Sequence, residues 1–120
     1  MGIIIREERG YHFGEGLPER PLIKHVEESG TLIELCYAHT IDRLLLYPKN
    51  LPPAFFDLSS GEAGAILQTL RNYHVRLAVV RSPALRLSSR FGELLTEEER
   101  GPYFRLFDER AAALAWLCST

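Results

Sequence analysis

The residues best placed to do chemistry form a short polar turn made of Asp57, Ser59, Ser60 and Gly61. An amphipathic helix is predicted to begin at this turn and to cover about residues 60–73. A helix N-terminus offers unpaired N–H groups and a positive dipole end, so it would stabilise a phosphate on Ser60. Ser59 and Glu62 also have the spacing of a capping box, which stabilises a helix by about 1 kcal/mol without any further role. A helix cap is the favoured interpretation, and phosphate chemistry is the alternative.

Two phenylalanines precede that helix in a proline-bounded connection. Phe55 and Phe56 are too apolar for a solvated loop, so they should join the core or cover a sheet edge. If part of the pair is exposed, it forms a contact patch for a protein partner beside the Ser60 turn. The rival hypothesis is an apolar pocket near Phe55, Phe56 and Tyr73, which would belong to a small-ligand carrier or an enzyme.

Recognised catalytic and metal-binding motifs are absent from the sequence. The histidines are scattered, and no HExxH, CxxC or G-x-S-x-G pattern occurs. The two cysteines, Cys36 and Cys118, are far apart and have no second ligand at metal-binding spacing. We therefore expect a protein that is not an enzyme and that uses no cofactor or metal.

A local excess of arginine follows the turn. No acidic residue occurs between Glu62 and Glu93, and that interval holds Arg71, Arg76, Arg81, Arg86 and Arg90. Guanidinium groups suit phosphate and carboxylate, but these five come from two predicted helices and a strand and need not converge. We interpret them as solvated surface and intramolecular ion pairs, and we do not expect nucleic-acid binding.

The composition is that of one globular domain over residues 1–120. Apolar residues make up 46% of the chain and the net charge is −2, which is too apolar and too weakly charged for a disordered protein. The N-terminal apolar run gives way at once to charged residues, so no signal peptide is expected. No apolar run is long enough to span a bilayer. We therefore expect a cytoplasmic protein that does not contact a membrane.

The N-terminal half should contain a hairpin and a helix. Consecutive β-branched residues at 3–5 predict a buried strand, and residues 11–15 could return as its partner. A helix is expected over about residues 26–39. Gly30 costs it roughly 1 kcal/mol against alanine, so either a close contact forms there or the helix begins after it. The expected inner face consists of Val26, Leu32, Ile33, Cys36 and Tyr37.

Strands and helices alternate after residue 40. Residues 42–47 and 75–80 read as apolar strands, and 103–107 as a shorter one. Ser82 and Pro83 open another predicted helix. The inward stripe of the helix at 60–73 should comprise Ala63, Ile66, Leu67, Leu70 and Tyr73. Asp108 can cap the last helix, along one side of which lie Ala112, Ala115 and Trp116.

This alternation implies parallel strand pairing with right-handed crossovers. The predicted fold is therefore a single α/β domain with a mixed, mostly parallel sheet. An antiparallel hairpin forms its N-terminal part, and the helices pack against the sheet.

The order of a strand, an Asp, small polar residues, a Gly and an amphipathic helix resembles the STAS domain of anti-sigma-factor antagonists. That family has Asp-Ser-Ser-Gly where this chain has Asp57-Leu58-Ser59-Ser60-Gly61, with Leu58 inserted. The resemblance implies a regulatory, protein-binding domain. It also implies that Ser60, which directly precedes the glycine, is the position a partner kinase would phosphorylate.

The chain also resembles a family of small bacterial proteins of unknown function. The shared pattern is FFDL at 55–58, Ser60-Gly61, Ala63-Gly64, ILQ at 66–68, Asn72-Tyr73 and RLA at 76–78. The resemblance implies a fold similar to STAS and no established activity. We therefore predict a regulatory module that recognises a protein partner through Asp57, Ser60 and Gly61 and the first half of the following helix. A homodimer is left open.

Overall fold

The computed structural model describes residues 3–52, 55, 62–81 and 101–119, with the backbone alone at Val26 and Glu62. The strands are β1 (Ile3–Glu8), β2 (Tyr11–Gly16), β3 (Arg43–Leu46), β4 (Arg76–Val80) and β5 (Phe104–Phe107). The α-helices are α1 (Ser29–His39), α2 (Glu62–Asn72) and α4 (Arg110–Leu117). Two 3-10 turns are η1 (Val26–Glu28) and η2 (Pro48–Asn50).

The five strands form one mixed sheet whose order, β1-β2-β3-β4-β5, follows the sequence. β1 and β2 make the antiparallel hairpin that the sequence predicts, with Glu8 opposite Tyr11 at its turn. β2, β3, β4 and β5 run parallel to one another. The α/β fold with an N-terminal hairpin is thereby confirmed.

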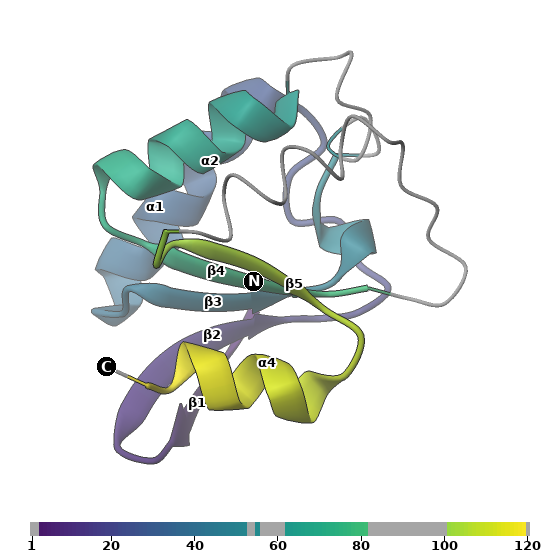
Figure 1. Ribbon diagram of the computed structural model, residues 1–120. Coiled ribbons are helices and arrows are strands. Elements are labelled where there is room, and N and C mark those ends of the chain that lie inside the picture. The colour runs from purple at the N-terminus through teal and green to yellow at the C-terminus, as the bar shows by residue number, and fades with distance from the viewer. Residues whose placement is uncertain (1–2, 53–54, 56–61, 82–100, 120) are drawn as a thin grey trace.

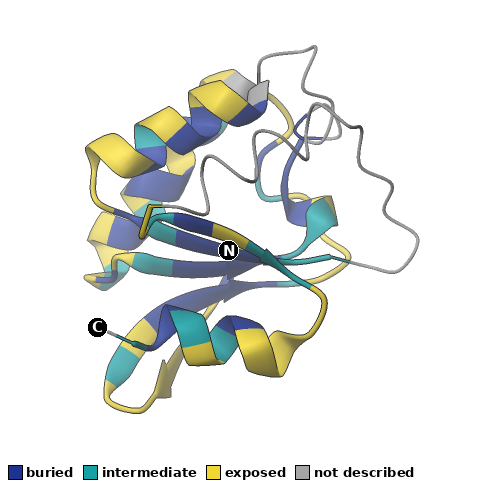
Figure 2. Cartoon of the chain, in the orientation of Figure 1, coloured by how far each residue is buried: buried dark blue, intermediate teal, exposed yellow. Residues whose placement is uncertain are grey.

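The sheet separates two hydrophobic cores. In Figure 1, α1 and α2 lie on one side of the sheet and α4 lies on the other. The larger core packs Leu44, Leu46 and Leu77 against α1 and α2. The smaller core packs Phe13 and Leu45 against α4. Figure 2 shows this pattern as dark strands between helices whose outward residues are exposed.

Two expectations about burial are wrong. Residues 3–5 form a strand, but β1 pairs only with β2 among the described strands, and Ile4 and Ile5 are 41% and 37% exposed. Tyr37 and Tyr73 come at the ends of α1 and α2, beyond the reach of the sheet, and they are exposed and contact each other edge to face. On α4 the buried residues are Ala113 and Leu117.

The beginnings of the helices also differ in detail from expectation. α1 begins at Ser29, and a Cβ built on Gly30 meets nothing within 4 Å, so no described part of the chain packs closely against this glycine. The N-cap of α4 is Glu109, with no side-chain cap hydrogen bond, whereas Asp108 pairs with Arg81 at 3.3 Å. The helix expected from Ser82 and Pro83 lies outside the described residues.

A buried asparagine anchors the loop between β2 and α1. Asn50 is fully buried, and its Nδ2 donates to the carbonyl oxygens of Leu17 and Arg20, both at 2.7 Å. Its Oδ1 accepts from the backbone N–H of Tyr47 at 2.7 Å. A Cβ on Gly16 would lie 2.3 Å from that oxygen, so the last residue of β2 has to be glycine.

Candidate functional site

The whole polar turn lies outside the described residues. These positions are Asp57, Ser59, Ser60 and Gly61, and Phe56 is outside as well. The structure does describe the helix that follows, because α2 begins at Glu62.

The two described members of the predicted aromatic patch have different surroundings. Phe55 is fully buried, and its ring packs edge to face on Phe104 with centroids 6.3 Å apart. Tyr73 is 53% exposed and follows the last residue of α2. Phe55 therefore belongs to the core, and Tyr73 belongs to the surface.

After Glu62, whose side chain lies outside the description, the outward residues in the first half of α2 are small and uncharged. Gly64, Ala65 and Gln68 are exposed there, whereas Ala63, Ile66 and Leu67 face the core. A Cβ built on Gly64 meets nothing within 4 Å. A glycine in a helix costs up to about 1 kcal/mol against alanine, and among the described residues no contact at Gly64 offsets that cost.

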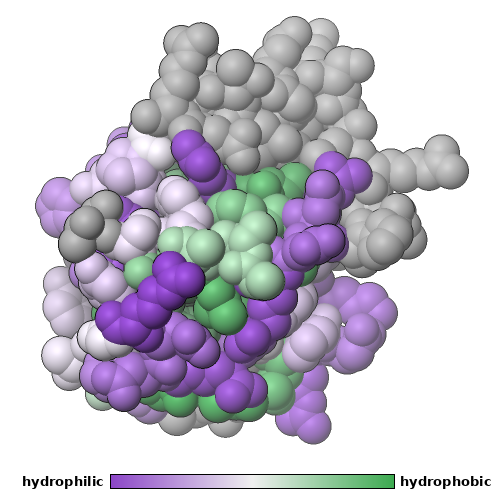
Figure 3. Space-filling view, turned by 60° about the horizontal axis from the view of Figure 1, so that its bottom comes forward, coloured by the Kyte–Doolittle hydropathy of each residue, from purple (hydrophilic) through white to green (hydrophobic). Residues whose placement is uncertain are grey.

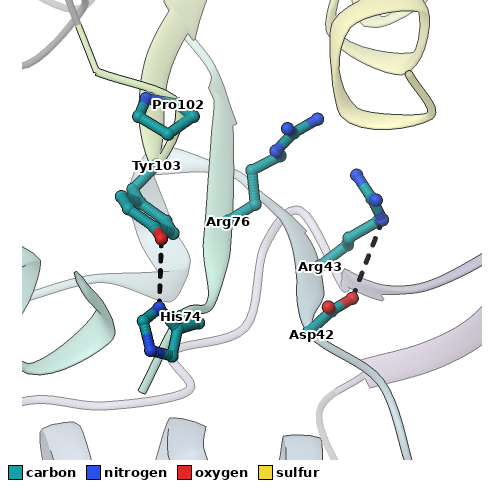
Figure 4. A pocket seen from close by; sticks show the side chains of 6 residues that line it. All are labelled: Asp42, Arg43, His74, Arg76, Pro102 and Tyr103. Carbon is teal, nitrogen blue, oxygen red and sulfur yellow. Dashed lines mark hydrogen bonds and ion pairs between the residues drawn. The ribbon is translucent and has the colours of Figure 1, made fainter. Parts of the chain in front are cut away.

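A second candidate site lies at the amino ends of the parallel strands. A cavity of about 250 Å³ is lined there by Asp42, Arg43, His74, Arg76, Pro102 and Tyr103. Asp42 precedes β3, His74 follows α2, and Tyr103 precedes β5, so consecutive elements bring these side chains to one edge of the sheet (Figure 4).

The two arginines are the first residues of neighbouring strands. Arg43 lies directly opposite Arg76 in the parallel register, so both side chains leave the same face of the sheet, toward the end of α4. Arg43 Nη1 donates to the carbonyl oxygen of Leu117 at 2.5 Å. Arg76 Nη1 donates to the carbonyl oxygen of Ser119 at 2.9 Å. Arg43 Nη1 donates to the same oxygen at 3.3 Å.

Aromatic rings and one carboxylate complete the surroundings of the two guanidinium groups. The Arg43 guanidinium lies over the ring of Tyr11, 4.4 Å from its centroid, and that of Arg76 lies 5.2 Å from the centroid of Trp116. Asp42 Oδ1 is 3.7 Å from Arg43 Nε, and the Asp42 side chain is 70% exposed. Burial, followed by the charge of Arg43, lowers the pKa of Arg76.

His74 lines the same cavity, and its backbone has an unfavourable conformation. Its φ is +58°, in the left-handed region that favours glycine at helix ends. In this position its Nδ1 lies 3.0 Å from the hydroxyl oxygen of Tyr103 (Figure 4). The side chain is thus held against the cavity in a backbone conformation that costs about 1 kcal/mol or more.

A buried carboxylate lies at the opposite edge, near the carboxyl ends of the strands. The Glu15 side chain is 8% exposed and accepts a bidentate pair from Arg110 at 2.8 and 2.9 Å. It also accepts from Arg6 Nε at 2.6 Å and from the Tyr47 hydroxyl at 2.5 Å. Burial alone would raise the pKa of Glu15, but these donors outweigh it and lower the pKa to about 2. The cluster ties α4 to the hairpin.

The cysteines are not reactive groups. Cys36 and Cys118 are buried and free. Burial, followed by the charge of Asp42, raises the pKa of Cys36 to about 11, and burial is also the main cause of the raised pKa of Cys118. Both thiols therefore stay protonated at neutral pH and are poor nucleophiles. Among the described residues, no three His, Cys, Asp or Glu side chains come together as a metal site.

The described arginines of the basic stretch do not converge. Arg76 is the first residue of β4 and Arg81 follows its last, so the two lie at opposite edges of the sheet. Arg71 lies on α2, and Arg86 and Arg90 are outside the described residues.

The surface over α4 is apolar. Ala111, Ala112 and Ala115 are exposed on it, and Leu114 is half-buried. Figure 3 views the molecule with this side turned forward and shows a hydrophobic area bordered by hydrophilic side chains. Among the described helices, none is long and apolar enough to cross a membrane.

The fold and its surfaces define a small α/β protein with a mixed five-stranded sheet. The chain belongs to the family described as a domain of unknown function, DUF4180, whose sequence profile matches residues 15–117. The match covers the chain from the end of β2 to the end of α4, so the prediction of a small family of unknown function is confirmed. No curated protein and no solved structure matches the chain.

Proposed function

We propose that the chain is a STAS-like regulatory module that binds a protein partner and is not itself an enzyme. The partner contacts the turn at residues 57–61 and the outward face of the first half of α2. The carrying observation is Gly64, a glycine in the first turn of α2 where a built Cβ would meet nothing within 4 Å. A partner whose backbone approaches closely at this point supplies a reason for the glycine that packing among the described residues does not.

The composition of this face supports recognition rather than solvation. The outward side of a helix in water is normally charged, yet the exposed residues that the structure describes after Glu62 in the first half of α2 are Gly64, Ala65 and Gln68. Charged residues are depleted at the centre of protein interfaces, because burying an unpaired charge is costly. An uncharged face of small residues lets two helices, or a helix and a strand, pack closely.

Ser60 provides the means of control in this proposal. It stands two residues before the first turn of α2, where the helix dipole favours an added anion. A phosphate would add about −1.5 to −2 charges beside a contact face whose described residues are uncharged. A partner that binds the small apolar face would be repelled by that charge, so phosphorylation would release it.

Substitutions at Gly64 test the contact face. We expect Gly64→Ala to stabilise the protein by about 0.5–1 kcal/mol in urea unfolding, because alanine removes the helix penalty without a clash. Gly64→Gln should leave stability near that of Gly64→Ala but weaken partner binding at least tenfold in pull-downs from a lysate of the native source. Gly30→Ala is the control on α1, and Ala112→Gln is the control on the surface over α4. Binding that survives Gly64→Gln and is lost with Ala112→Gln would place the interface on α4 and overturn the proposal.

Substitutions at Ser60 test the switch. We expect Ser60→Asp to release a partner that wild type and Ser60→Ala both retain, since only the aspartate adds negative charge. Intact-mass analysis of the natively expressed protein should show a fraction carrying one phosphate. If wild type and Ser60→Asp capture the same partners and no phosphate is found, Ser60 is a helix cap only.

A further inference from the structure

The cavity at the amino edge of the sheet has a charge arrangement that packing alone does not explain. The parallel register places Arg43 directly opposite Arg76, and like charges in that position repel each other. The repulsion is felt by Arg76, whose pKa is lowered by burial and by Arg43. Two cations held at one place require compensating negative charge or a strong dipole.

The compensation that the described residues provide is incomplete. The last carbonyl groups of α4 carry the negative end of a helix dipole, but they are neutral acceptors. The carboxylate that lines the cavity, Asp42, is largely exposed and lies 3.7 Å from Arg43 Nε. Two arginines and one aspartate leave a formal charge of +1 at the cavity, with His74 counted as neutral.

Hydrogen-bonding capacity is also left over. Within the described part of the chain, Arg76 uses only Nη1, which reaches the carbonyl oxygens of Trp116 and Ser119. Arg43 uses Nη1 for its hydrogen bonds and Nε for its ion pair. Each guanidinium therefore keeps an Nη2 group, and Arg76 keeps its Nε as well. Such paired donors match the oxygens of a phosphate or a carboxylate.

The cavity has the size and the walls for a small ligand. Its volume is about 250 Å³. The ring of Tyr103, braced by its hydrogen bond to His74, and the ring of Pro102 form its less polar wall (Figure 4). His74 has the left-handed backbone that ends α2, and the N–H groups of His74 and Val75 donate to the carbonyl oxygens of Arg71 and Leu70.

We propose that this cavity binds a small oxyanion, a phosphate or carboxylate group, between the guanidinium groups of Arg43 and Arg76. The anion supplies the negative charge that the described residues lining the cavity lack. The remainder of the ligand lies against Tyr103 and Pro102. This site is separate from the face of α2 proposed to bind a protein.

The test is a titration with inorganic phosphate, and separately with acetate, at constant ionic strength. Binding is followed by NMR through backbone amides and arginine Nε–H signals. We expect at least one of the two anions to give saturable shifts centred on Arg43, Arg76 and Tyr103. The anion that binds more tightly identifies the group. Phenyl phosphate or benzoate should then bind several-fold more tightly than the bare anion, because the ring would lie on Tyr103.

Two variants with opposite expected effects separate binding from damage to the fold. Arg76→Gln should weaken anion binding at least tenfold. Asp42→Asn should tighten it several-fold, because it removes the competing carboxylate, and a structural defect would not do so. Arg81→Gln is the matched control, since it removes the same charge from the other end of the same strand.

Three results would each overturn the proposal. Shifts that stay linear and unsaturated with both anions would show that the cavity is not a site. Equal weakening by Arg76→Gln and Arg81→Gln would show a general charge effect. Binding unchanged or weakened by Asp42→Asn would show that the cavity charge does not govern the affinity.

Discussion

Replacing Asn50 with alanine is expected to lower the free energy of unfolding by about 3–5 kcal/mol, which is a large part of the stability of a small domain. The side chain is fully buried, and it makes three hydrogen bonds of 2.7 Å to backbone groups of Leu17, Arg20 and Tyr47. Each buried group left without a partner costs about 1–3 kcal/mol. Urea unfolding of both proteins measures the difference as a shift in midpoint.

Two further variants define what Asn50 does. Asn50→Asp keeps the shape but loses both N–H donors and buries a charge, so it should be at least as damaging as Asn50→Ala. Lys49→Ala is the neighbouring control, because Lys49 is exposed and forms a surface ion pair with Glu19 at 2.7 Å. Its effect should be below about 0.5 kcal/mol. If Asn50→Ala lowers the free energy of unfolding by less than about 1 kcal/mol, Asn50 does not anchor the loop between β2 and α1 in the way its hydrogen bonds suggest.

The second large effect concerns Glu15 and acid. The folded protein holds the pKa of Glu15 at about 2, below the ordinary value of 4.5, so the ionised form is stabilised by folding. That contribution is fully present above about pH 4.5 and is lost as the pH falls toward 2. We expect it to be worth about 2–3 kcal/mol, after an allowance for the partial exposure of Arg6 and Arg110. Glu15→Gln should therefore be less stable than wild type at pH 7.

The difference between Glu15→Gln and wild type should shrink as the pH falls from 4.5 to 2. Urea unfolding at several pH values measures it. Glu19→Gln is the control, since Glu19 is exposed and pairs only with exposed Lys49 among the described residues. A difference between Glu15→Gln and wild type that stays constant between pH 4.5 and 2 would contradict the assignment of this carboxylate as the acid-sensitive group.

The alternation of strands and helices was sufficient to predict the sheet, because apolar runs of four to six residues separated by amphipathic segments have few ways to pair. The exposure of residues in the edge strand and at the ends of the helices was harder to predict. Residues 3–5 have the composition of a buried strand, but composition does not say whether a strand will have one neighbour or two. Tyr37 and Tyr73 continue the helical period of the inner faces, and only the length of the sheet decides that they extend beyond the core.

The side-chain clusters at the two ends of the parallel strands could be predicted only with the strand register, and the sequence does not provide it. Glu15 follows Phe13 at a spacing of two, which places a carboxylate on the same buried face, and this was the available signal. Its partners Tyr47 and Arg110 come from distant segments. Arg43 and Arg76 each stand at the start of an apolar strand, but their opposition depends on β3 and β4 being neighbours in exact register. Asn50 gave no signal beyond its position between prolines.

The order of the strands has a consequence for how the protein is made. As each strand of β1-β2-β3-β4-β5 leaves the ribosome, its neighbour in the sheet is already present, so the sheet can grow one strand at a time. The face that carries Phe13, Leu45 and Ala78 is different, because α4 covers it and follows all five strands. During synthesis this hydrophobic face of the sheet is exposed to water until residue 117 has left the ribosome. We therefore expect the nascent chain, rather than the finished protein, to be the form that chaperones bind.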